Sequence, residues 1–520
     1  MNIQRLNLKF LIILIFFIYL IFDFYIQNSK KNYQFELSWD EIDYVNAANQ
    51  GILNNAFEFT SENLINFLIR GYNKIYKNEK ISNINENEIK TYNYLSEDIF
   101  DLRHFHPPLL IYYLNFFLDE NIKLQDIKVN FSFQLIGYIL IISLFLLTIN
   151  YKNTKLLNII FLIIFLNIIL NSQFFQTSIG RINFHLLFSL NLLFYCYSLS
   201  KFLKKQNNKK LIRISFFQSI LFLSLETSFI IFTITLIIFI YYVYLKKINI
   251  SQLLKFIIFS FLITIILWPA NLYNFTILKT FLMYFYRIIF ALESDYKNLS
   301  YLSTIWDIIE SNFIYFLTII IFLLLNFKKL LKAKFKYNIY LIYSLIYFVF
   351  IIPFTHNVTY VLPSLVLLSY YTMIVFINDK ISLQKYLIII FLFVIINYSK
   401  FSNIINYNIN NLQIYTLIND IKSTNVDNPK ILADGAHILE YYSNYKKIYN
   451  LHFYEKYKPK FYIEISNKYY DLTSLIKQSF FDIIYISKFR NFSLNDMDYL
   501  YSAGYIYMEN NSYHIYYKNH

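Results

Sequence analysis

The chain has few of the residues that build soluble, disordered or disulfide-linked proteins. Only 15% of its 520 residues are charged, and it contains six glycines, seven prolines and one cysteine. The low charge excludes an intrinsically disordered chain and argues against an ordinary soluble domain. The single cysteine, Cys196, leaves no pair for an internal disulfide and gives no information on the redox compartment.

Hydrophobic residues make up 57% of the chain and recur in apolar runs of roughly 15 to 20 residues, long enough to cross a bilayer. The net charge of +14 is concentrated in short lysine-rich loops, as at Lys201–Arg213 and Lys246–Lys247. Such loops between apolar spans are typical of the cytoplasmic side of a membrane protein. We therefore attribute the charge to membrane topology and expect no nucleic-acid partner.

Charge and length together predict eleven membrane spans. Arg5 and Lys9 precede an apolar run at 10–22 that lacks a small-residue cleavage site, so we interpret it as a retained first span with a cytoplasmic N-terminus. A large external loop follows at 28–130. Further spans are predicted at 131–149, 157–171, 184–200, 254–270, 311–327 and 386–398, with a two-span hairpin at 214–245 and another around Pro353–Pro363.

The last 120 residues have a different character and are predicted to lie outside the membrane. Short strands are expected at 429–435 and 481–486, a helix at 493–501 and a hairpin at 505–517. The predicted fold class is a multi-pass α-helical membrane protein over residues 1–400. A small C-terminal periplasmic α/β domain is predicted at 401–520.

The polar groups least explained by topology all fall on the predicted external side. They are Asp40, Glu41, Arg103, His104, His106, Arg181, Asn183, His185, Glu226, Arg287 and His356. Simpler interpretations stay open: the acids suit a helix start, the histidines suit interfacial hydrogen bonding, and Arg181 suits a snorkelling arginine. A carboxylate as deep as Glu226 requires a partner.

The order of these groups resembles that of the GT-C membrane glycosyltransferases, most closely the protein O-mannosyltransferase and aminoarabinose-transferase branch. Asp40-Glu41, followed by Tyr44, resembles the Asp-Glu motif of the first loop. His106-Pro107-Pro108-Leu109 resembles the Pro-Pro-Leu element. The similarity extends to Arg181 before the fourth span and to Tyr360-Val361-Leu362-Pro363 after His356. It covers roughly residues 8 to 400.

The resemblance implies transfer of a sugar from a polyprenyl-phosphate donor to a lipid, glycan or protein acceptor, with inversion. It makes Asp40 the catalytic base, with Glu41 as a second catalytic acid that orients Asp40, binds the acceptor or holds a divalent metal. Donor phosphate would be bound by Arg103, Arg181, Arg287, His106 and His356, and substrate by Tyr44, Glu226 and Tyr360. The expected location is a bacterial inner membrane.

The sequence departs from the family pattern at two places. Asn183 or His185 stands where an acid often follows the arginine, and Leu225-Glu226-Thr227-Ser228 replaces a turn that often carries lysine. A transporter or flippase for a lipid-linked saccharide is the main rival, although such proteins often show repeats that are not visible here. A polysaccharide polymerase or ligase is the second. Glycoside hydrolysis is disfavoured because adjacent carboxylates rarely span a sugar.

Overall fold

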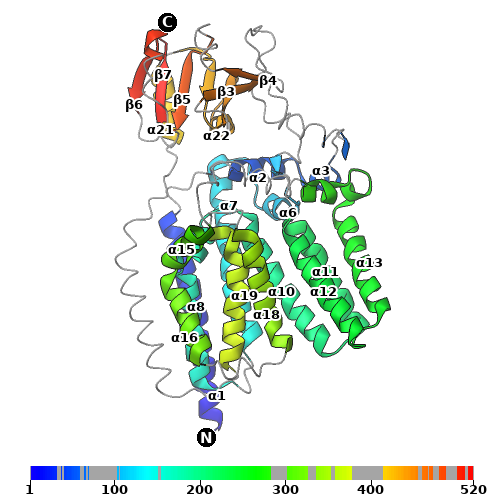
Figure 1. Cartoon of the computed structure of the whole chain (residues 1–520). Coiled ribbons are helices and arrows are strands. Elements are labelled where there is room, and N and C mark those ends of the chain that lie inside the picture. The colour runs from blue at the N-terminus through cyan, green and yellow to red at the C-terminus, as the bar shows by residue number, and fades with distance from the viewer. Residues whose placement is uncertain are drawn as a thin grey trace.

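The computed structural model is mostly helical, with a β-sheet region near the C-terminus (Figure 1). It describes residues 2–31, 37, 40–58, 64–65, 68, 102–104, 106–149, 154–282, 301–325, 335–352, 358–377, 414–424, 426–454, 460–465, 468–471, 480–487, 500–509 and 513–518.

A bundle of long helices forms most of the described chain. Its helices are α1 (Asn2–Lys31), α7 (Ile122–Thr148), α8 (Leu156–Leu170), α10 (Phe184–Lys204), α11 (Asn208–Ser224), α12 (Ser228–Tyr244), α13 (Ile250–Leu267), α16 (Phe313–Leu325), α18 (Phe335–Ile351) and α19 (Val358–Ile377). Short helices lie at one end of this bundle: α2 (Asp40–Asn49), α3 (Ile52–Phe57), α6 (Leu109–Asn115), α9 (Gln173–Ile179), the 3₁₀ turn η3 (Pro269–Leu272) and α15 (Tyr301–Ser311). Figure 1 shows α2 and α3 between the bundle and the sheet, and we call this the α2 end of the bundle.

Several helix starts are fixed by asparagine side chains that cap the first turn. Asn183 accepts a hydrogen bond from Leu186 N at 3.0 Å at the start of α10, and Asn207 does the same for α11 at 2.9 Å. Asn121 caps α7 through Leu124 N. That cap starts α7 about two and a half turns before the predicted span at 131–149, because polar first turns stay helical beyond the apolar run.

The helices pack through close approaches and buried hydroxyl groups. On α11, Ser219 Oγ donates to Ser260 O of α13 at 2.7 Å. Thr235 of α12 is 2.6 Å from the Tyr343 hydroxyl of α18. At Gly137 of α7, a Cβ would clash with the Ile179 side chain of α9, so any larger residue there requires that side chain to move. Small residues and hydroxyl pairs are typical of helix contacts in membranes.

Four described helices are long and apolar enough to cross a membrane, and six do so if two bent pairs each count as one span. The bent pairs are α8 with α9, at 64°, and α15 with α16, at 89°. Shorter apolar helices lie at Ser228–Tyr244, Asn338–Ile351 and Thr359–Val375, within the two predicted hairpins. A multi-pass helical architecture is thus confirmed. The predicted span at 386–398 lies outside the described residues.

Two predicted loops contain helices. The segment predicted as a turn at Gln176–Asn183 begins as α9, which follows a bend at Ser172. The external segment predicted before span 8 ends in α15, an amphipathic helix that lies against the bundle before the chain turns into α16. Both helices are too short to be recognised from apolar length, and both lie where the chain changes direction.

The C-terminal region is a seven-stranded mixed sheet in the order β4-β3-β2-β1-β5-β7-β6. The strands are β1 (Ile431–Ala433), β2 (Ile448–Tyr454), β3 (Lys460–Ile465), β4 (Lys468–Asp471), β5 (Ile483–Ser487), β6 (Ile506–Glu509) and β7 (Tyr513–Tyr517). Central β1 is fully buried and pairs in parallel with both β2 and β5, whereas all other pairs are antiparallel. The predicted strands and final hairpin are confirmed. The predicted helix at 493–501 lies almost entirely outside the described residues.

Helix α22 (Ala436–Tyr442) follows β1 and docks the C-terminal region onto the α2 end of the bundle. The Tyr442 hydroxyl accepts from Leu37 N at 2.6 Å and donates to Asp126 Oδ2 of α7 at 2.8 Å. The Tyr441 hydroxyl accepts from Gln125 Nε2 at 2.7 Å. Because Asp126 is buried, these bonds satisfy a carboxylate that would otherwise be costly.

Candidate active site

The two acids that open α2 have different surroundings. Asp40 projects outward, with a side chain 61% exposed. Glu41 is buried, and its Oε1 accepts a hydrogen bond from Ile182 N at 3.0 Å. Glu41 therefore fixes the start of α2 to the segment between α9 and α10. This leaves Asp40 as the accessible carboxylate of the pair.

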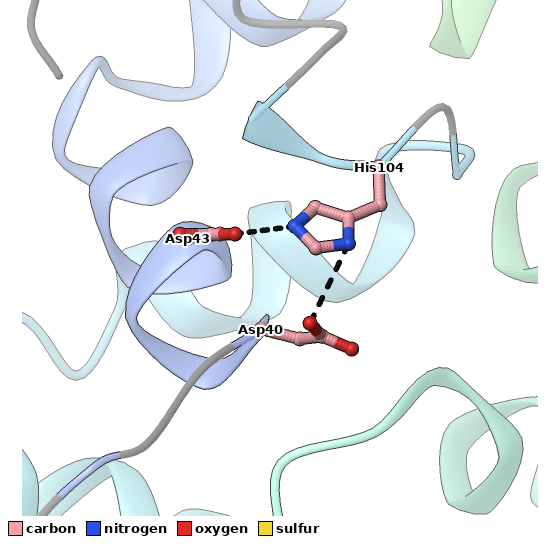
Figure 2. Close-up of side chains that lie close together, drawn as sticks. All are labelled: Asp40, Asp43 and His104. Carbon is pink, nitrogen blue, oxygen red and sulfur yellow. Dashed lines mark hydrogen bonds and ion pairs between the residues drawn. The ribbon is translucent and has the colours of Figure 1, made fainter. Parts of the chain in front are cut away.

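His104 lies between two carboxylates of α2 (Figure 2). Its Nε2 bonds to Asp43 Oδ2, and its Nδ1 lies 3.6 Å from Asp40 Oδ1. Asp40 and Asp43 are three residues apart, so helical spacing places them on the same face of α2. His104 has a positive φ of 51°, a left-handed backbone conformation that is uncommon for residues other than glycine.

His106 reaches the turn between α11 and α12. Its Nδ1 lies 2.7 Å from Glu226 Oε2, and both side chains are only 11% exposed. This imidazole is the partner that the deep carboxylate requires. Tyr44 of α2 links the two histidines, because its ring packs 5.6 Å from the His104 ring and 6.3 Å from the His106 ring.

Arg103 is fully buried and forms an ion pair with Glu58, which is also fully buried. Its Nη1 donates to Asn55 O at 3.2 Å, and its guanidinium lies 5.5 Å from the Trp268 ring centroid. Burial lowers the pKa of Arg103 to about 9, so the group stays charged at neutral pH. Arg103 is predicted from the sequence to bind the donor phosphate, but these contacts use its guanidinium to join α3 to η3.

The other predicted residues are placed less closely together. Arg181 is exposed and directly precedes Ile182, the residue that binds Glu41. Tyr360 of α19 is 36% exposed and packs against His185 in a tilted arrangement, with ring centroids 4.1 Å apart. Arg287 and His356 lie outside the described residues. The structure thus joins Asp40, Glu41, Tyr44, His106 and Glu226 around α2.

The sequence did not single out His437, which lies in α22, the helix of the C-terminal region that packs against α2. Burial lowers its pKa, and it interacts electrostatically with Asp43, His104 and Asp40. It lies four residues after the end of β1, beyond Asp434, Gly435 and Ala436. Ligands of α/β sheets often bind where the chain leaves a central parallel strand and its neighbours diverge. The sequence signal that could have pointed to His437 is the short predicted strand that ends in Asp434-Gly435.

Comparison with protein-family models, curated proteins and solved structures finds no match to this chain. The site consists of the exposed Asp40 carboxylate, the imidazoles of His104 and His106 that Tyr44 links, and the buried Glu41 carboxylate that fixes α2.

Proposed function

We propose that the chain is an integral membrane glycosyltransferase of GT-C type, with eleven spans in residues 1–400 and an external domain at 401–520. It transfers a sugar from a polyprenyl-phosphate donor to a lipid, glycan or protein acceptor. The observation that carries the proposal is the meeting of two distant sequence elements. Tyr44, which follows the Asp40-Glu41 pair, packs on His106 of the His-Pro-Pro-Leu element, and His106 binds Glu226.

The proposed orientation follows from the charges. Helix α10 starts beside Ile182 at the α2 end and runs 21 residues to Lys204, roughly 30 Å away. The lysine-rich turns after α10 and α12 therefore lie at the opposite end of the bundle. The positive-inside rule assigns that end to the cytoplasm. The α2 end then faces the periplasm of a bacterial inner membrane.

In the proposed reaction, the acceptor hydroxyl attacks the anomeric carbon of the donor sugar. The bond from that carbon to the phosphate oxygen breaks, and the polyprenyl phosphate leaves with the electron pair. Asp40 takes the hydroxyl proton, since it is the accessible carboxylate of α2. General-base help of this kind contributes about 10²–10⁴-fold. Glu41 holds α2 in place, and Glu226 positions His106.

Arg181 is the described arginine best placed for the departing phosphate. It is exposed and adjoins the residue that binds Glu41, whereas Arg103 is committed to Glu58. A guanidinium offers paired donors that match phosphate oxygens. The exposed apolar residues of α13, including Ile258, Leu262 and Ile266, suit contact with lipid chains.

The test is sugar transfer by purified protein in lipid nanodiscs, with radiolabelled polyprenyl-phosphate sugars and a membrane extract as acceptor. We expect Asp40→Asn to abolish transfer without loss of folding. Asp119→Asn is the matched control, because the Asp119 carboxylate pairs with Lys128 at the surface and accepts from Asn121 N at 3.0 Å, and both contacts are local. Transfer that survives Asp40→Asn would remove Asp40 as the base. Donor binding without any transfer would favour transport of a lipid-linked saccharide.

A further inference from the structure

The Asp40–His104–Asp43 arrangement has the geometry of a metal site with its supporting carboxylate. His104 Nε2 bonds to Asp43 Oδ2 and its Nδ1 faces Asp40 Oδ1 (Figure 2), so the tautomer that donates from Nε2 directs its Nδ1 lone pair toward Asp40. Histidines that bind metals commonly give their other ring N–H to a carboxylate in this way, which fixes the tautomer and the ring orientation.

The distance between the two facing atoms also fits. Nδ1 and Oδ1 are 3.6 Å apart, which is longer than an N–H···O hydrogen bond. Two ligands bound tetrahedrally to one ion at about 2.1 Å would lie about 3.4 Å apart. Ligand atoms from all three residues lie within 4.8 Å of one another.

One further observation points to a cation. Oδ1 of Asp43 is buried and has no hydrogen-bond partner among the described residues, so this carboxylate retains acceptor capacity beside the cluster. The buried His437 of α22, a helix that packs against α2, also interacts electrostatically with all three residues.

We propose that His104 and Asp40 bind one divalent transition-metal ion, with Asp43 orienting His104. Mixed imidazole and carboxylate ligands suit ions such as Mn²⁺ or Zn²⁺ better than Mg²⁺, which favours oxygen. Because Asp40 is exposed, the remaining coordination positions face solvent. On the proposed glycosyltransferase function, on which this last step rests, they take the donor phosphate, and the second oxygen of Asp40 accepts the hydroxyl proton.

The test measures metal binding directly, by electron paramagnetic resonance titration of Mn²⁺ with the full chain in nanodiscs and competition by Zn²⁺. We expect one saturable site. His104→Asn removes the imidazole but suits the positive φ, since asparagine tolerates the left-handed region, and it should lower affinity at least 100-fold. Asp43→Asn should lower affinity about 10- to 100-fold, as for other supporting carboxylates.

His514→Asn is the matched control, because His514 lies in β7 of the C-terminal sheet and bonds to Tyr507. It should bind Mn²⁺ like the unmodified chain. Lack of a saturable site in the unmodified chain, or unchanged affinity in His104→Asn and Asp43→Asn, would overturn the proposal. If His104→Asn does not fold, as judged by gel filtration and thermal melting, Asp43→Asn decides.

Metal binding and sugar transfer can fail separately. Mn²⁺ binding that depends on His104, without transfer of any sugar, would keep the metal site and reject the glycosyltransferase. Transfer without metal binding would reject the metal site and keep the enzyme.

Discussion

Removing the charge of Glu58 should destabilise the protein strongly, although Glu58 lies outside the proposed chemistry. Glu58 and Arg103 are both fully buried and paired, and Glu58 Oε1 also accepts from the Trp268 indole N–H at 3.2 Å. Glu58→Gln keeps the size of the side chain and an acceptor for Trp268. It therefore removes the negative charge with little else changed.

The magnitude follows from what the substitution leaves behind. The pKa of Arg103 is about 9, so at pH 7 the guanidinium keeps its charge in a site with no exposure to water. Breaking a buried ion pair by removing one partner costs about 3–5 kcal/mol, because the remaining charge stays buried without compensation. We expect a loss of this size in the free energy of unfolding at pH 7.

The assay is reversible unfolding in mixed detergent micelles, with Arg103→Met added to Glu58→Gln as the second arm. Removing both charges should recover at least about 2 kcal/mol of the loss, since a neutral pair carries no uncompensated charge. A cost below about 1 kcal/mol for Glu58→Gln, or a double variant less stable than the single one, would refute the reasoning.

Three further outcomes are expected. Glu226→Gln should reduce the initial rate of sugar transfer at least tenfold without unfolding, because His106 loses a charge-assisted bond worth about 1.5–3 kcal/mol; an unchanged rate would count against a positioning role. Burial raises the pKa of Glu440 from 4.5 to about 7, so its contribution to stability is fully present below pH 4.5 and is lost as pH rises through 7. Glu440→Gln should therefore stabilise the protein by about 1 kcal/mol at pH 8, after discounting for its partial exposure, and not at pH 4.5 in thermal melts. Tyr442→Phe removes the bonds to Leu37 and Asp126 and should weaken docking of the C-terminal region by about 2–3 kcal/mol, measured as faster limited proteolysis; an unchanged cleavage rate would contradict the docking role.

Much of the bundle could be predicted because apolar length and loop charge are both local signals. The turn predicted near Glu226-Thr227-Ser228 lies between α11 and α12, and α8 begins and ends within one residue of the predicted span at 157–171. The early start of α7 was missed because it depends on an asparagine cap. The bends before α9 and α16 depend on packing between distant helices.

Part of the site could also be predicted from apolar length and loop charge. Placing the scattered polar groups on one side of the membrane brought Asp40, His106 and Glu226 near one another. It gave no means of choosing the contacts among them. Asp43 is absent from the predicted site residues, although helical spacing puts it on the same face of α2 as Asp40. Arg103 was expected at the donor phosphate, but its ion pair with Glu58 depends on folding across the loop and could not be read from spacing.

Because α22 is synthesised long after α2, the docking contact between them forms late in translation. Leu37 and Tyr442 bond across 405 residues of chain. At about 5–20 residues per second, a ribosome needs roughly 20 to 80 seconds to make the intervening polypeptide. Throughout that interval α2 has emerged while His437 does not yet exist. A nascent chain with its helices already inserted thus lacks the contacts between α22 and α2, and these contacts form only once α22 has been made.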